Sequence, residues 1–152
     1  MESIQEIGIP TLVLWPNADA GSNDISRGIR KWREKMNCDL FYFVKNLPVS
    51  TYISLMQKTS CLIGNSSSGI REGSFIGTPT VNIGTRQNKR ERGLNVLDTE
   101  YDKQKIVNAI KMQLDNGRYP SETIYGEGNA GLKIANILAN LENLSTQKTI
   151  TY

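Results

Sequence analysis

Short apolar runs alternate with longer amphipathic segments along this chain, and that alternation most constrains its fold. Five runs have the length and composition of buried strands: 11–15, 40–44, 61–64, 80–83 and 94–97. The segments between them have helical spacing; in one, apolar residues recur at intervals of 4, 3 and 4 (Ile25, Ile29, Trp32 and Met36). Strands that alternate with helices predict an α/β fold in which helices cover both faces of one parallel sheet, giving three layers.

The helix boundaries follow from serines and from apolar spacing. Ser22 and Ser50 are expected to cap helices, and a further helix is expected from about Ser67 to Ile76. Two helices close the chain, one with Ile106, Val107, Ile110 and Leu114 facing inward and one with Leu132, Ala135, Ile137, Leu138 and Leu141 as its apolar residues. We expect one domain over residues 1–144 and a flexible tail from 145 to 152.

Composition excludes several classes of chemistry. The chain has no histidine, which rules out a histidine general base, a Ser-His-Asp triad and any histidine metal ligand within it. Cys38 and Cys61 are too isolated for a disulfide framework or a metal site. We therefore expect no metal and no cofactor.

Charge and hydropathy narrow the classes of partner that the chain is expected to bind. The net charge is only +3, and the basic residues are interspersed with acidic ones, so nucleic acid is not an expected partner. No apolar run approaches the roughly 20 residues of a membrane span, and the N-terminus lacks a signal-peptide pattern. These features favour a cytoplasmic protein that does not bind membranes.

The segment Gly64-Asn65-Ser66-Ser67-Ser68-Gly69 joins a predicted strand to a predicted helix. Backbone N–H groups at a helix start, with serine hydroxyls beside them, are suited to binding a phosphate. The same residue types also make a well-capped turn with no ligand. The segment lacks the Walker A ending, the dinucleotide-binding glycine pattern and a nucleophile elbow, so a serine nucleophile is not expected.

Polar residues follow four of the predicted strands and should meet at one rim of the sheet. They are Asn17, Asn46, the serines at 66–68 and Arg86. Ligands of open α/β sheets bind at this rim, so it is the expected site of a phosphorylated small molecule. Arg86 is the best candidate for an anion contact. Asn17 either shapes a turn or offers its amide to a base or ribose.

Glu72 lies about one turn into the helix that follows the serines. It either compensates the helix dipole or accepts the two hydroxyls of a ribose. With the serines on phosphate, the second role gives a coherent nucleotide site.

Five motifs occur in a characteristic order. They are Pro16-Asn-x-Asp-Ala-Gly-Ser22, Gly64-Asn-Ser-Ser-Ser-Gly-Ile-Arg-Glu72, Gly77-Thr-Pro79, Asn82-Ile-Gly-Thr-Arg-Gln87 and Ile124-Tyr-Gly-Glu-Gly-Asn-Ala130. Together they resemble the C-terminal half of hydrolysing UDP-N-acetylglucosamine 2-epimerases, over residues 9 to 140. The resemblance implies one incomplete half of a GT-B fold, in which two Rossmann-like halves close on a UDP-sugar.

The family's chemistry is elimination of UDP followed by addition of water, which gives free N-acetylmannosamine for sialic acid synthesis. Carried over by matching motif, the UDP contacts would be Asn17, Asn46, Leu47, Ser66, Ser67, Glu72 and Arg86. The family's acid/base carboxylates lie in the N-terminal half. The resemblance therefore implies no catalytic residue in this chain, and an enzyme that needs the missing N-terminal catalytic half.

Two other functions fit the same residues. The chain could be the nucleotide-sugar-binding half of a GT-B glycosyltransferase, or a UDP-sugar-binding module without catalysis. In all three cases the expected ligand is UDP or a UDP-sugar. An incomplete sheet with an exposed edge can also promote self-association into a homo-oligomer.

Overall fold

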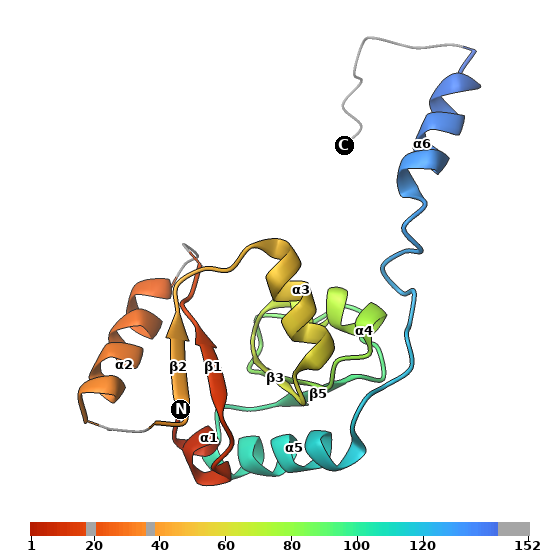
Figure 1. Cartoon of the computed structure of the whole chain (residues 1–152). Coiled ribbons are helices and arrows are strands. Elements are labelled where there is room, and N and C mark those ends of the chain that lie inside the picture. The colour runs from red at the N-terminus through yellow and green to blue at the C-terminus, as the bar shows by residue number, and fades with distance from the viewer. Residues whose placement is uncertain (18–20, 36–38, 143–152) are drawn as a thin grey trace, which may run out of the picture.

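The computed structural model describes residues 1–17, 21–35 and 39–142, and within these ranges helices and strands alternate (Figure 1). The elements are α1 Glu2–Ile7, β1 Thr11–Leu14, α2 Ser22–Lys35, β2 Phe41–Val44, α3 Val49–Lys58, β3 Leu62–Gly64, the 3₁₀ turn η1 Ser67–Gly69, α4 Glu72–Ile76, β4 Thr80–Ile83, β5 Val96–Thr99, α5 Lys103–Asn116 and α6 Ala130–Ala139. All five predicted strands are confirmed, although β5 begins two residues later than expected. Met36, Cys38 and the tail predicted for 145–152 lie outside the described residues.

Every strand pairing is parallel, but the strands form two hydrogen-bonded groups. In the first group β1 pairs with β2, with Thr11 opposite Phe41. In the second group β4 lies between β3 and β5. Figure 1 shows α5 on one side of the second group and α3 and α4 on the other, which is the expected three-layer arrangement. The prediction of one continuous sheet is not met among the described residues, because no ladder joins β1 to β3.

Packing of α1 against α5 connects the two groups. Lys103 Nζ lies 2.8 Å from Glu6 Oε2, and the Ser3 hydroxyl donates to the Lys103 carbonyl at 3.3 Å. The core of the second group is centred on three residues that are buried where β4 meets α5: Val81, Ala109 and Ile110. Helix α5 therefore covers the sheet with the face that the sequence predicts.

Two predicted helix caps are wrong. Helix α2 begins at Ser22 itself, and α3 begins at Val49, so neither Ser22 nor Ser50 occupies the cap position. Pro48, and not a serine, occupies the cap position of α3, and its restricted φ of −55° fixes the backbone direction where the helix begins. In α5 a side-chain cap does form, because Asp102 Oδ1 accepts the Lys105 N–H at 2.8 Å.

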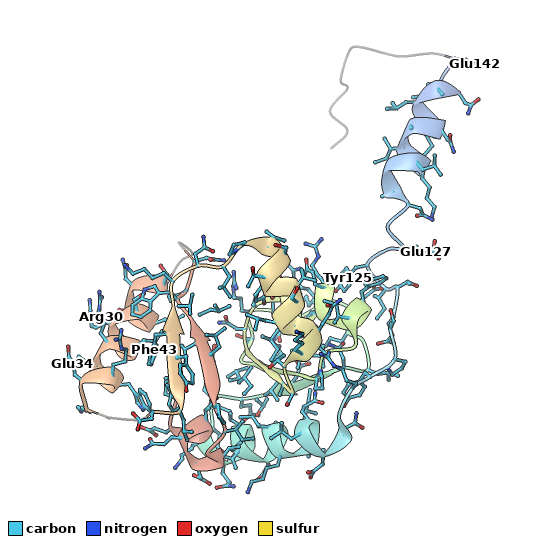
Figure 2. All side chains as sticks on the ribbon, in the orientation of Figure 1. Arg30, Glu34, Phe43, Tyr125, Glu127 and Glu142 are labelled. Carbon is cyan, nitrogen blue, oxygen red and sulfur yellow. The ribbon has the colours of Figure 1, made fainter. Side chains whose placement is uncertain are left out.

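Helix α6 extends away from the rest of the chain (Figure 1), and its side chains lie clear of the sheet (Figure 2). Leu132 is 67% exposed and Leu138 is 59% exposed. The apolar residues predicted for this helix are therefore present but do not pack against the strands. None of the helices in the described ranges is long and apolar enough to cross a membrane.

Candidate functional site

The serine turn (residues 64–69) leaves the carboxyl end of β3 and leads into α4. The single helix expected from about Ser67 to Ile76 is divided into η1 and α4. A Cβ at Gly69 would lie 2.6 Å from Thr80 Cγ2 and 3.1 Å from Leu62 Cδ2. The turn can therefore lie directly on β3 and β4 only because residue 69 is glycine.

The three serines of the turn have different surroundings. Ser66 Oγ accepts the Ser68 N–H at 3.3 Å, and the two hydroxyls are 3.0 Å apart. Ser68 Oγ is also 2.6 Å from the Tyr52 hydroxyl, which attaches the turn to α3. In the described part of the chain Ser67 Oγ has no hydrogen-bond partner. Ser66 and Ser68 thus shape the turn. The Ser67 hydroxyl is available to a ligand, and the exposed Ser66 hydroxyl, whose oxygen accepts within the turn, can still donate to one.

Both ends of the serine turn are held by hydrogen bonds to backbone carbonyls. At the first end, the Asn65 carbonyl accepts from Gln87 Nε2 at 2.8 Å and from Arg86 Nη1 at 3.3 Å. At the second, the Gly69 carbonyl accepts from Asn95 Nδ2 at 3.0 Å and from Thr80 Oγ1 at 3.3 Å. The turn is therefore fixed before any ligand arrives, which lowers the entropy cost of binding.

Gln87 and Asn95 are site residues that the sequence analysis missed. Asn95 is 0% exposed and also donates to the Thr78 carbonyl at 2.8 Å. Asn95 lies inside an apolar run that predicts a strand, and a buried amide at such a position needs hydrogen-bond partners. That feature could have identified it from the sequence. Gln87 is also buried, and its signal was a polar residue directly beside the predicted anion contact Arg86.

Four of the predicted ligand contacts come from segments that adjoin the serine turn. Ser66 and Ser67 belong to it, Glu72 is the first residue of α4, and Arg86 reaches the turn through the Asn65 carbonyl. Glu72 is exposed, and its carboxylate makes no hydrogen bond within the described ranges. Hydroxyl, carboxylate and guanidinium groups therefore lie at the carboxyl ends of β3 and β4.

The other three predicted contacts follow the strands of the first group. Asn17 follows β1 and is exposed, while Asn46 and Leu47 follow β2. Asn46 Oδ1 accepts the Leu47 N–H at 2.9 Å, so in this structure the side chain shapes its own turn. The described hydrogen bonds connect none of these residues to the serine turn.

A hollow that could be mistaken for the site lies elsewhere. It has a volume of about 480 Å³ and is lined by residues 123–130 and Lys133, at the base of α6. It is open, and α6 forms one of its sides, so we place the site at the serine turn on chemical grounds. No cluster of three or more His, Cys, Asp or Glu that could hold a metal occurs in the described ranges.

The fold and this site define an α/β protein with Rossmann-like parallel strands and a preformed polar turn at the strand ends. The sequence model of the UDP-N-acetylglucosamine 2-epimerase family matches residues 1–139. The chain therefore belongs to that family.

Curated relatives agree with this assignment. The chain is 26% identical over 152 residues to a UDP-N-acetylglucosamine 2-epimerase of Neisseria meningitidis serogroup B, covering 97% of this chain and 39% of the relative. It is 28% identical over 130 residues to a hydrolysing UDP-N,N'-diacetylbacillosamine 2-epimerase of Legionella pneumophila, covering 86% and 34%. It is 40% identical over 84 residues to the hydrolysing GDP/UDP-N,N'-diacetylbacillosamine 2-epimerase of Campylobacter jejuni, covering 55% and 22%. The chain thus spans 39% or less of the length of these relatives.

Proposed function

We propose that this chain is the UDP-binding half of a hydrolysing UDP-N-acetylglucosamine 2-epimerase. The observation that carries the proposal is the serine turn held at both of its end carbonyls, with the Ser67 hydroxyl and the Glu72 carboxylate unpaired within the described ranges. Membership of the epimerase family and the Neisseria relative support the choice of UDP-N-acetylglucosamine. The Legionella and Campylobacter relatives, which are hydrolysing 2-epimerases of diacetylbacillosamine nucleotides, support the hydrolysing reaction.

Each residue of the site has a chemical role in this proposal. The hydroxyls of Ser66 and Ser67 donate to the diphosphate, and the Arg86 guanidinium neutralises part of its charge. Glu72 accepts the two ribose hydroxyls. Residues from the first strand group, Asn17, Asn46 and Leu47, complete the contacts to the nucleoside.

Catalysis in this proposal needs a second half. We place the acid/base groups that remove UDP and add water in the N-terminal half of a GT-B enzyme. The chain covers 39% of the length of the Neisseria relative, which leaves room for such a half. We therefore propose that this chain supplies the UDP site, while its partner half supplies the groups that act on the sugar.

Alanine substitutions test the UDP site directly. Ser67→Ala and Glu72→Ala should each weaken UDP binding by about 1–3 kcal/mol, because each removes a hydrogen bond to the ligand. Calorimetric titration measures the affinities. Ser60→Ala, at the opposite end of β3, and Glu34→Ala, on α2, are matched controls that should bind like the unsubstituted chain.

A ligand that lacks one ribose hydroxyl tests the role of Glu72 separately. If Glu72 holds both ribose hydroxyls, Glu72→Ala should weaken binding of 2'-deoxy-UDP less than binding of UDP. Unchanged UDP affinity in a variant whose circular dichroism spectrum is unaltered would remove that residue from the site.

A further inference from the structure

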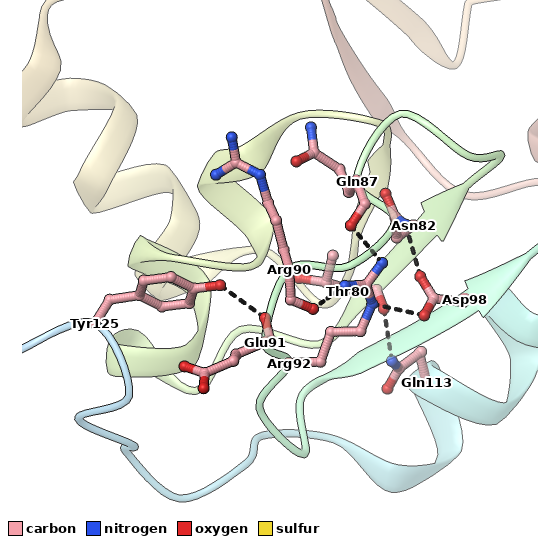
Figure 3. Close-up of polar contacts among 9 residues, drawn as sticks. All are labelled: Thr80, Asn82, Gln87, Arg90, Glu91, Arg92, Asp98, Gln113 and Tyr125. Carbon is pink, nitrogen blue, oxygen red and sulfur yellow. Dashed lines mark hydrogen bonds and ion pairs between the residues drawn. The ribbon is translucent and has the colours of Figure 1, made fainter. Parts of the chain in front are cut away.

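A series of polar contacts runs from the β4–β5 region to the serine turn. Figure 3 shows its first part, from Asn82 through Asp98 and Arg92 to Gln87. Asn82 Nδ2 donates to Asp98 Oδ1 at 2.6 Å, and Arg92 Nε donates to Asp98 Oδ2 at 2.6 Å. Arg92 Nη2 donates to the backbone carbonyl of Gln87 at 2.8 Å. The Gln87 side chain then donates to the Asn65 carbonyl, so the series ends at the first residue after β3.

We propose that Arg92 and Asp98 are positioning residues that set the place of the serine turn through Gln87, and thereby its affinity for a nucleoside diphosphate. This inference rests on the proposed function of the turn as the UDP site. The hydrogen bonds described for Arg92 and Asp98 do not include one to the turn itself, so any effect on the ligand must pass through the loop at residues 85–94.

The guanidinium of Arg92 connects three points of the molecule. Its Nε pairs with Asp98 on β5, Nη2 donates to the Gln87 carbonyl, and Nη1 donates to the Arg90 carbonyl. Its side chain is only 20% exposed, whereas that of Asp98 is 50% exposed. Arg92 therefore links two backbone carbonyls of the loop to β5, and this constrains the loop more strongly than an exposed ion pair would.

The Gln87 amide depends on this attachment. Gln87 is 3% exposed, and its Oε1 is buried with no hydrogen-bond partner in the described part of the chain. The hydrogen bonds of the residue are thus the Nε2 contact to Asn65 and those at its backbone carbonyl, which accepts from Arg92 Nη2 and from the Arg90 N–H at 3.3 Å. Without Arg92 the carbonyl keeps only the Arg90 N–H, which belongs to the same loop and does not attach it to β5, so the loop can withdraw the Gln87 amide from the turn.

The neighbour of Gln87 in sequence is Arg86, which also donates to the Asn65 carbonyl. A shift of the loop would therefore displace both donors that hold this end of the turn. The consequence for a ligand is a less preorganised set of serine groups, which lowers affinity without removing any group that touches UDP.

Three variants test whether Arg92 acts on the serine turn through Gln87, a connection that we call the relay, or only through its charge. Arg92→Ala removes all the contacts. Arg92→Lys keeps the positive charge, but a single ammonium group cannot reproduce the planar fork that reaches both Asp98 and the Gln87 carbonyl. Lys105→Ala is the matched control, because it breaks a 2.7 Å ion pair to Glu100 just beyond β5, away from the loop.

Calorimetry with UDP and amide spectra of the ligand-free chain provide two readouts. We expect the UDP dissociation constant to rise about three- to tenfold in both Arg92 variants, and to stay unchanged in Lys105→Ala. In the same variants the amide resonances of residues 66–69 should shift before any ligand is added.

Other results would overturn the relay. Wild-type affinity in Arg92→Lys, or unshifted amides of residues 66–69 in Arg92→Ala, would each contradict it. If Arg92→Ala fails to fold, Asp98→Asn provides the same comparison, with shifted amides supporting the relay and unshifted amides opposing it. If the unsubstituted chain does not bind UDP, the proposed function fails, whereas the amide shifts of the ligand-free protein still decide the relay.

Discussion

At the scale of single residues, the loop after β4 contains a strained backbone position. Lys89 has a φ of 67°, and among the described residues it is the one non-glycine with positive φ. A left-handed conformation costs an L-residue about 1–2 kcal/mol, whereas glycine adopts it freely but loses more entropy on folding. The two effects partly cancel, so the substitution to glycine should give a modest net gain.

We predict that Lys89→Gly raises the free energy of unfolding by up to about 1 kcal/mol, and that Lys89→Val lowers it, because a β-branched residue is least tolerant of this φ. Urea denaturation measures both variants. A valine variant as stable as the glycine variant would show that the loop does not hold residue 89 in this conformation.

Cys61 provides a prediction about pH. Burial raises the pKa of its thiol to about 12, opposed by a weaker backbone hydrogen bond from Val81. In the unfolded chain the thiol ionises near pH 9, while in the folded chain it stays protonated. Its contribution to stability is therefore complete below pH 9 and is lost as the pH rises toward 12.

The unfolding free energy should fall over that range by at most about 1.4 kcal/mol per pH unit from this group. Cys61→Ala should show a shallower decline, because other groups that titrate there are common to both proteins. Urea denaturation at pH 8, 10 and 11 makes the comparison. Parallel declines would contradict burial of the thiol.

Three residues of the candidate site could be placed beside the serine turn from the sequence. Ser66, Ser67 and Arg86 come directly from the ends of β3 and β4, so their position needed only the strand assignments. Gln87 and Asn95 act on carbonyls 22 and 26 residues away in sequence. Their roles depend on how the turn, the loop and β4 come together, which no local pattern encodes.

At the scale of elements, helices α5 and α6 have similar apolar spacing but different surroundings. Ile110 on α5 is 3% exposed within the core, whereas Leu138 on α6 is mostly exposed. We predict that Ile110→Ala lowers the unfolding free energy by about 2–5 kcal/mol. Leu138→Ala should change it by less than about 0.5 kcal/mol. Chemical denaturation measures both, and equal losses would mean that α6 packs on the core.

The sequence predicted which segments are helices and strands better than what they pack against. Short apolar runs located β1 to β4 closely. The run at 94–97 was misleading, because Leu94 is exposed and Asn95 points its amide into the core, and pairing with β4 begins only at Val96. For α6 the apolar residues predicted a helix, but periodicity carries no information about a partner surface.

At the scale of the whole molecule, the two strand groups each carry part of the proposed site, and the chain covers 39% or less of its curated relatives. We predict that the chain alone releases no N-acetylmannosamine from UDP-N-acetylglucosamine, because the acid/base groups of the proposed reaction belong to the other half. Product analysis by chromatography tests this. Free N-acetylmannosamine formed by the isolated chain would contradict the division of roles between the halves.

We propose above all that the serine turn and its neighbours form a uridine diphosphate site. Calorimetric titration of the chain with UDP, with ADP alongside, tests it most directly. We predict saturable binding of UDP and much weaker binding of ADP. A folded chain that binds neither nucleotide, or binds both equally, would contradict it.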